Sequence, residues 1–238
     1  MKTVLIYCIS CNLPPYPMLM QAALDTWDKL DVPGIETRFY CGGCPAIDHP
    51  KILHFKVSDN YANMGKKNLL AFDWALDQCE WDYMARINAS CYVRKQKLLD
   101  YVQDLPEKGL FKGVASNGPV DSSFMWGGAQ FILSRDVIEA ICANRDKWHH
   151  GPMEDISMTK IIKELGFTPD STGNACSINR DKDHWLCIYY ENGKQGGFEF
   201  TDMCEMKKAE SQFFIRVKQD LKRHIDVQIM KELFACGI

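Results

Sequence analysis

Two adjacent carboxylates, Glu154 and Asp155, stand at the start of an apolar pattern that is typical of a helix. A structural interpretation is available, because the helix dipole favours acidic side chains in the first turn. A catalytic interpretation is also available, because a carboxylate can take the proton from a hydroxyl group that attacks a substrate. Each of the two residues is therefore a candidate general base.

The cysteines offer a second kind of chemistry. Cys8 and Cys11 form one CxxC pair, and Cys41 and Cys44 form another, which is a known arrangement for zinc ligands. The gap between the pairs is longer than in a zinc ribbon, and each pair ends an apolar run, where cysteine often packs as a small hydrophobic residue. A zinc-stabilised interaction protein is thus one alternative. The odd number of cysteines, 11, and the lack of a secretory signal predict reduced thiols in a cytosol.

Apolar runs that predict strands alternate with helical patterns along most of the chain. This alternation predicts an α/β fold in which helices flank a mostly parallel central sheet. Ligands of such sheets bind beyond the carboxyl ends of the strands. The polar segments that follow the strands should therefore share one rim, and these are residues 10–12, 41–44, 57–61 and 88–90. The runs that predict strands are 4–10, 37–41, 52–57, 83–87, 110–115 and 130–133.

Three other stretches complete the predicted elements. Helical spacing is clear from about residue 64 to 79, with Leu70 and Trp74 on one face. Residues 179–185 are dense in polar side chains, which favours a solvated loop before a strand. The last stretch predicts a strand over 212–217 and then a helix, whose apolar face holds Leu221, Ile225, Ile229 and Leu233.

The composition is that of an ordinary globular domain, with 46% hydrophobic and 25% charged residues over 238 positions. The net charge of −3 gives no indication of broad electrostatic binding to nucleic acid. No segment approaches the roughly 20 apolar residues that a membrane span requires. We therefore expect neither a nucleic-acid partner nor a transmembrane segment.

Four further segments carry a family pattern. The most specific is 59–67, where the pattern Asp-x-Tyr-x-Asn-Leu-Thr-x-Lys is matched at Asp59, Tyr61, Asn63 and Lys67. The others are 23–42, 83–93 and 124–135, the last of which is followed at a suitable distance by Glu154 and Asp155. Together these segments resemble glycosyltransferase family 31, which includes Fringe and the β-1,3-galactosyl- and N-acetylglucosaminyltransferases.

The resemblance covers about residues 4 to 185 and implies a GT-A (Rossmann-like) fold. It also implies a nucleotide-sugar donor, most simply a UDP-sugar, and inverting transfer to a glycan, glycolipid or glycoprotein hydroxyl. In the family the second acid of the pair is the base, which selects Asp155, with Glu154 as the substitute. Trp126 either stacks on an acceptor sugar or packs in the core, and His150 is a candidate acceptor contact because it is near Glu154. The residues implied to bind the donor are Ser10, Asp59, Tyr61, Lys67, Arg86, Asn88, Ser90, Gly127 and Gly128.

One departure from the family concerns the metal. Family members carry three consecutive acids after the strand, and the first and third hold Mn²⁺ or Mg²⁺ against the donor diphosphate. Here Asn88 and Ser90 occupy those positions, and neither brings a charge. Neutral ligands could hold the metal with help from a later side chain such as His184, or the site could have lost activity. A third explanation is that basic residues neutralise the diphosphate, and the candidates are Lys67, Arg86, Arg180 and Lys182.

We therefore expect a single glycosyltransferase domain over residues 1–238. Its donor-binding half should reach about residue 93, its acceptor and catalytic half about 190, and a strand–helix extension should follow, covering the acceptor side or mediating dimer contact. The alternative is a catalytically impaired glycan- or nucleotide-binding protein on the same fold, which Asn88 and Ser90 favour. Most family members have a membrane anchor, so its absence predicts a cytoplasmic bacterial or viral-type member, or an excised domain.

Overall fold

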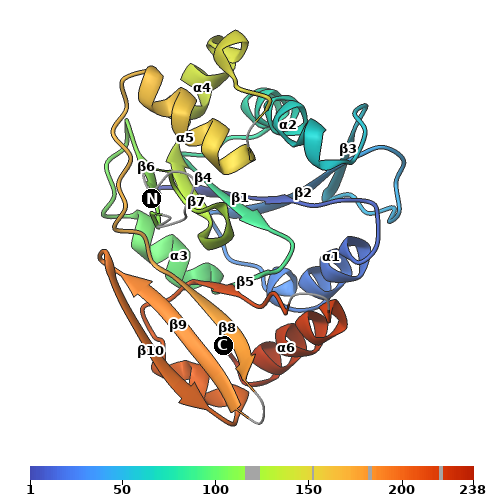
Figure 1. Ribbon diagram of the computed structural model, residues 1–238, viewed down its shortest axis with the longest axis vertical. Helices are drawn as coiled ribbons and strands as arrows, with labels where there is room; N and C mark the ends of the chain where they lie inside the picture. Colours follow the sequence, from blue (N-terminus) through green and yellow to red (C-terminus); the bar gives the residue numbers. More distant parts are fainter. Residues whose placement is uncertain (116–123, 152, 182–183, 220–221) are drawn as a thin grey trace.

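A six-stranded sheet forms the centre of the computed structural model, which describes residues 1–115, 124–151, 153–181, 184–219 and 222–238 (Figure 1). Its strand order is β3-β2-β1-β4-β7-β6. β1 to β4 run parallel, β7 is antiparallel to β4, and β6 is antiparallel to β7. The expected mostly parallel α/β sheet is thus confirmed. The strands are β1 (Val4–Ile9), β2 (Ile35–Gly42), β3 (Ile52–Phe55), β4 (Tyr83–Asn88), β6 (Phe111–Gly113) and β7 (Phe131–Ser134).

Helices cover both faces of this sheet. One face packs against α2 (Met64–Gln78), α4 (Arg135–Ala143) and α5 (Glu154–Glu164), which lie above the sheet in Figure 1. The other face packs against α1 (Tyr16–Asp25) and α3 (Lys95–Val102), and α6 (Arg223–Ala235) packs against α1. Alternate residues of β1 enter the two cores, which explains why its sequence is continuously apolar.

A second, five-stranded sheet has the order β10-β9-β8-β11-β5. β5 follows β4 after one short turn and pairs antiparallel with β11, so that Cys91 faces Arg216. The expected solvated loop is wrong for residues 179–181 and 184–185, which belong to the hairpin of β8 and β9. Pairing with a neighbouring strand satisfies the backbone of this polar stretch. The strands are β5 (Cys91–Val93), β8 (Ala175–Asp181), β9 (His184–Glu191), β10 (Lys194–Phe200) and β11 (Phe214–Arg216).

The buried face of α2 differs from the expected one. Leu70 is 40% exposed and Trp74 is only partly buried, whereas Leu69 and Phe72 are in the core. The helix is rotated so that a polar side chain, Asn68, is also fully buried. This rotation turns part of α2 toward the site described below.

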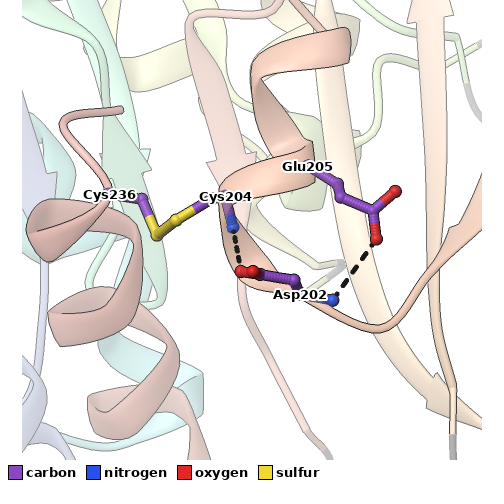
Figure 2. Close-up of a disulfide and its surroundings, with 4 residues drawn as sticks. All are labelled: Asp202, Cys204, Glu205 and Cys236. Atoms are coloured by element: carbon purple, nitrogen blue, oxygen red, sulfur yellow. Dashed lines mark hydrogen bonds between the residues drawn. A yellow bond between two sulfur atoms is a disulfide. The ribbon is translucent and has the colours of Figure 1, made fainter.

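One disulfide joins the short 3₁₀ helix η5 (Met203–Lys208) to the end of α6 (Figure 2). It links Cys204 to Cys236, so the expectation of reduced thiols is wrong for this pair, which the fold brings to a Cα–Cα distance of 5.1 Å. Asp202 and Glu205 cap η5 beside the bond. Among the described residues, no helix combines the length and the apolarity needed to cross a membrane.

The two CxxC pairs do not gather as a zinc site. Cys8 and Cys41 are buried in the core, while Cys44 is exposed. In the described part of the chain, one group of His, Cys, Asp or Glu side chains is close enough to share a metal, and it consists of Asp202 and the two disulfide cysteines. Cys8 and Cys41 therefore act as packing residues at strand ends, whereas Cys11 and Cys44 lie outside the core.

Candidate active site

A cavity of about 620 Å³ opens at the carboxyl ends of β1 and β4. The rim predicted from the strand pattern contributes residues 10–11, 59–61 and 88–90, but residues 12, 41–44 and 57–58 do not line the cavity. The remaining walls come from α2, the segment 124–128, the start of α5 and the C-terminal elements β11 and α6. The cavity thus combines segments from both ends of the chain.

A buried ion pair forms the floor of the site. The Arg86 guanidinium lies 2.5 Å from the Glu154 carboxylate, and their side chains are 2% and 4% exposed. The other Glu154 oxygen accepts a hydrogen bond of 2.7 Å from Asn68, which in turn accepts one of 2.8 Å from the Tyr40 hydroxyl. Burial raises the pKa of Glu154, and the positive charge of Arg86 opposes that rise. Glu154 is therefore bound on both oxygens and is poorly placed to act as a base.

Asp155 stands in different surroundings, although it is the next residue. It lines the cavity and is only partly buried. One carboxylate oxygen accepts a hydrogen bond of 3.0 Å from the Gly127 backbone, and the other accepts one of 3.0 Å from the Ile156 backbone. A side chain at Gly127 would crowd the Asp155 carboxylate, because its Cβ would lie 3.0 Å from the Asp155 Cβ. These contacts fix the orientation of the Asp155 carboxylate. Both donors are neutral backbone N–H groups, so neither contact places a positive charge beside the carboxylate.

A second buried pair holds the loop after β1. Lys67 Nζ lies 2.6 Å from an Asp59 oxygen and also donates to the Ser10 carbonyl at 2.6 Å. The other Asp59 oxygen accepts a hydrogen bond of 2.6 Å from the Asn12 backbone. Burial works to raise the pKa of Asp59, but the bonds from Lys67 and Asn12 outweigh it and hold that pKa below its usual value. Both predicted donor residues thus line the cavity while bracing its wall.

The residues expected to hold a metal are Asn88, Ser90 and His184. The Asn88 side chain accepts from Arg86 at 3.1 Å and donates to the Gly127 carbonyl at 3.0 Å. Ser90 is buried beside β11, whereas His184 is exposed at the start of β9 and does not line the cavity. Hard divalent cations require several oxygen ligands and favour carboxylates. The cavity carboxylates of Asp59 and Glu154 are already paired with Lys67 and Arg86. The neutral side chains of Asn88 and Ser90 therefore fit a divalent cation poorly.

Three basic residues of the cavity were not foreseen from the sequence. Arg216 ends β11, Lys218 follows it, and Arg223 begins α6. The backbone of Val217 donates a hydrogen bond of 2.9 Å to the Ser90 carbonyl, so this segment lies against the position of the family's third acid. The sequence offered one local indication that these three residues reach the cavity: they lie near the ends of a predicted strand and a predicted helix.

Aromatic side chains complete the cavity. The Arg216 guanidinium lies 5.1 Å from the centre of the Trp126 ring, and Trp126 also packs edge-on against Tyr190. One face of Trp126 is therefore covered by a cation, and the residue also lines the cavity. Tyr61 is 65% exposed at the rim. His150 is exposed and does not line the cavity.

Of the other basic candidates, Arg180 lies 5.4 Å from the Trp185 ring, outside the cavity lining, and Lys182 falls outside the described residues. Lys67 and Arg86 line the cavity but are held in the two ion pairs. The structure therefore brings together all predicted donor residues, Trp126 and both acids, but neither His150 nor His184.

No family model matches the chain, and no curated protein matches its sequence. In fold it is similar to a solved glycosyltransferase involved in the glycosylation of the major capsid of PBCV-1, with a TM-score of 0.54 and 8% identity over 96% of this chain and 98% of that chain. The solved catalytic domain of Drosophila beta1,4galactosyltransferase 7, in complex with xylobiose, gives a TM-score of 0.42 and 13% identity over 71% of this chain and 64% of that chain. Membership of family 31 stays a prediction, whereas the first likeness shows that this chain shares the fold of that glycosyltransferase.

Proposed function

We propose that the protein is a glycosyltransferase that moves a sugar from a nucleoside-diphosphate sugar, most simply a UDP-sugar, to a hydroxyl group of a glycan or glycoconjugate. The observation that carries this proposal is that Asp155 and a set of cations line one cavity at the carboxyl ends of parallel strands. An oriented carboxylate suits a hydroxyl acceptor, and cations suit an anionic leaving group.

The reaction follows from these roles. The acceptor hydroxyl oxygen attacks the anomeric carbon and forms the new glycosidic bond, while Asp155 takes the hydroxyl proton. The bond between the anomeric carbon and the phosphate oxygen of the donor breaks, and the nucleoside diphosphate leaves with the electron pair on that oxygen. Attack from the side opposite the leaving group inverts the anomeric configuration. Exposed Tyr61 at the rim supplies an aromatic surface for the nucleoside.

Donor binding is the first test. A ligand that binds only the folded state raises the unfolding temperature, so UDP-, GDP-, CMP- and dTDP-sugars should be compared by thermal shift, each with Mn²⁺ and with EDTA. We expect one nucleotide to stabilise the protein. If none does under either condition, the proposal fails.

Turnover is the second test. Asp155→Asn should lower the rate of sugar transfer by roughly 10²- to 10⁴-fold, because an amide cannot accept the proton, and it should leave donor binding intact. Asp146→Asn, an exposed site outside the cavity, is the matched control and should keep the wild-type rate. An unchanged rate in Asp155→Asn would remove this residue from the mechanism.

A second candidate function is a nucleotide- or glycan-binding protein without catalysis. It is favoured by the neutral pair Asn88 and Ser90, since the Asn88 amide is already used by Arg86 and Gly127. Binding of a nucleotide sugar with neither transfer nor hydrolysis, across a panel of acceptors, would support this candidate over the enzyme.

A further inference from the structure

The cations of β11 and α6 are built into the cavity wall. The Arg216 guanidinium lies over the Trp126 ring, and a side-chain atom at Gly128 would overlap that guanidinium. Arg223 is held by a bond of 2.5 Å to Asp226 and lies 5.7 Å from the Tyr16 ring. Aromatic packing and ion pairing restrict the conformations of both arginines, so little further entropy is lost when they bind an anion.

Two consecutive glycines set the base and a cation close together. Asp155 packs against Gly127 and binds its backbone, while Arg216 packs against Gly128. The proposed base and a cation are thus positioned by two neighbouring residues of one segment. A transferred sugar that lies between an acceptor and a leaving diphosphate requires such an arrangement.

The balance of charge in the cavity also points to an anion. The described lining contains five cations and three carboxylates, and two of the carboxylates are taken by Lys67 and Arg86. Three of the five cations, Arg216, Lys218 and Arg223, lie on the C-terminal segment next to Ser90, and Arg223 is paired with Asp226, which does not line the cavity. Ser90 occupies the position at which, by the family resemblance, the third acid holds the metal.

We infer that Arg216, Lys218 and Arg223 bind the diphosphate of the donor in place of a divalent cation, so that donor binding needs no metal. This inference rests on the proposed function and names the groups that stabilise its leaving group. A guanidinium can bind two phosphate oxygens at once, and several cations together can match the charge of a diphosphate.

Binding of UDP, GDP, CDP and dTDP should be measured by calorimetry, with uridine as a probe that lacks phosphate, in EDTA and in Mn²⁺. We expect one diphosphate to bind in EDTA with an affinity that falls as salt is added, because the contact is electrostatic. Lys218→Gln should weaken that binding about fivefold, since an exposed charge is partly screened. Arg216→Lys should weaken it about tenfold through loss of the two-pronged contact.

Lys222→Gln is the matched control. Lys222 is exposed, carries the same charge and lies in the same segment, but it does not line the cavity. It should bind the diphosphate like the wild type, and thermal unfolding should show that all variants are folded.

The outcomes separate this inference from the proposed function. Binding that requires Mn²⁺, or binding in EDTA that Lys218→Gln and Arg216→Lys leave unchanged, overturns the inference while the proposed function stands. If no diphosphate binds in either condition, both fail together.

Discussion

Glu154 and Asp155 are neighbours in the chain, yet their carboxylates have different partners. Glu154→Gln would leave the buried Arg86 charge unpaired, and removal of one partner from a buried pair costs about 3 kcal/mol or more. We expect this loss in the free energy of unfolding, measured with urea. The double variant Arg86→Gln/Glu154→Gln should lose less than the sum of the single variants, because the two residues interact. Additive losses would show that the pair contributes no coupling.

A single glycine controls the position of Arg216. In Gly128→Ala the new methyl group would displace the guanidinium and approach the Trp126 ring at 2.6 Å. We expect binding of the nucleoside diphosphate to weaken about tenfold, as measured by calorimetry, because a charged hydrogen bond is lost. Gly151→Ala is the control, since its Cβ would meet no atom within 4 Å, and it should bind normally.

The Asp59–Lys67 pair makes the free energy of unfolding depend on pH in the acid range. The pKa of Asp59 is lowered in the folded protein, so the pair stabilises fully above the unfolded carboxyl pKa of about 3.9. That contribution is lost as the pH falls through the lower, folded pKa. Urea unfolding from pH 6 down to pH 3 should show a shallower decline for Asp59→Asn than for the wild type. Asp25→Asn, at an exposed site on α1, should decline like the wild type.

At the scale of elements, the disulfide fastens α6 to η5. A cross-link between residues 204 and 236 restricts the unfolded chain, and a loop of this size corresponds to about 4 kcal/mol. We expect reductant to lower the free energy of urea unfolding of the wild type by that order. In Cys204→Ser/Cys236→Ser the reductant should have no effect. Equal unfolding of the wild type with and without reductant would contradict the prediction.

The elements that the sequence predicted well are those with unambiguous patterns. β1 is continuously apolar because both of its faces are buried, and α5 begins at two acids and ends before Gly166, whose φ is +88°. The strands β8 to β10 were not all recognised because their side chains are partly exposed and mixed in polarity. The face of α2 was assigned by hydrophobicity alone, whereas the site requires Asn68 to be buried.

At the scale of the whole molecule, the cavity joins segments that are distant in sequence. Ser10, Asp59 and Asn88 could be placed on one rim because parallel strands end at the same edge. Arg216 and Lys218 could not be placed, because their position depends on the pairing of β11 with β5. One sequence carries no direct signal for such long-range pairing.

The shared contribution of these distant segments to one binding cavity can be tested by hydrogen exchange. Nucleotide binding should slow amide hydrogen exchange in peptides that cover 57–64, 86–91 and 214–219, because a ligand that bridges the walls suppresses their local opening. Mass spectrometry with and without the nucleotide would report the change. A peptide from β10, which does not line the cavity, should exchange at the same rate in both states.

The pairing of β5 with β11 also has a consequence for biosynthesis. A ribosome that makes this chain has already added the three carboxylates of the described lining, the last of them Asp155, before it adds Arg216. β5 cannot form its ladder in the second sheet until β11, the strand it pairs with, has been synthesised. Until then the half-built cleft lacks the cations proposed to hold the diphosphate. Chains that end before residue 216 would therefore lack the proposed diphosphate-binding residues.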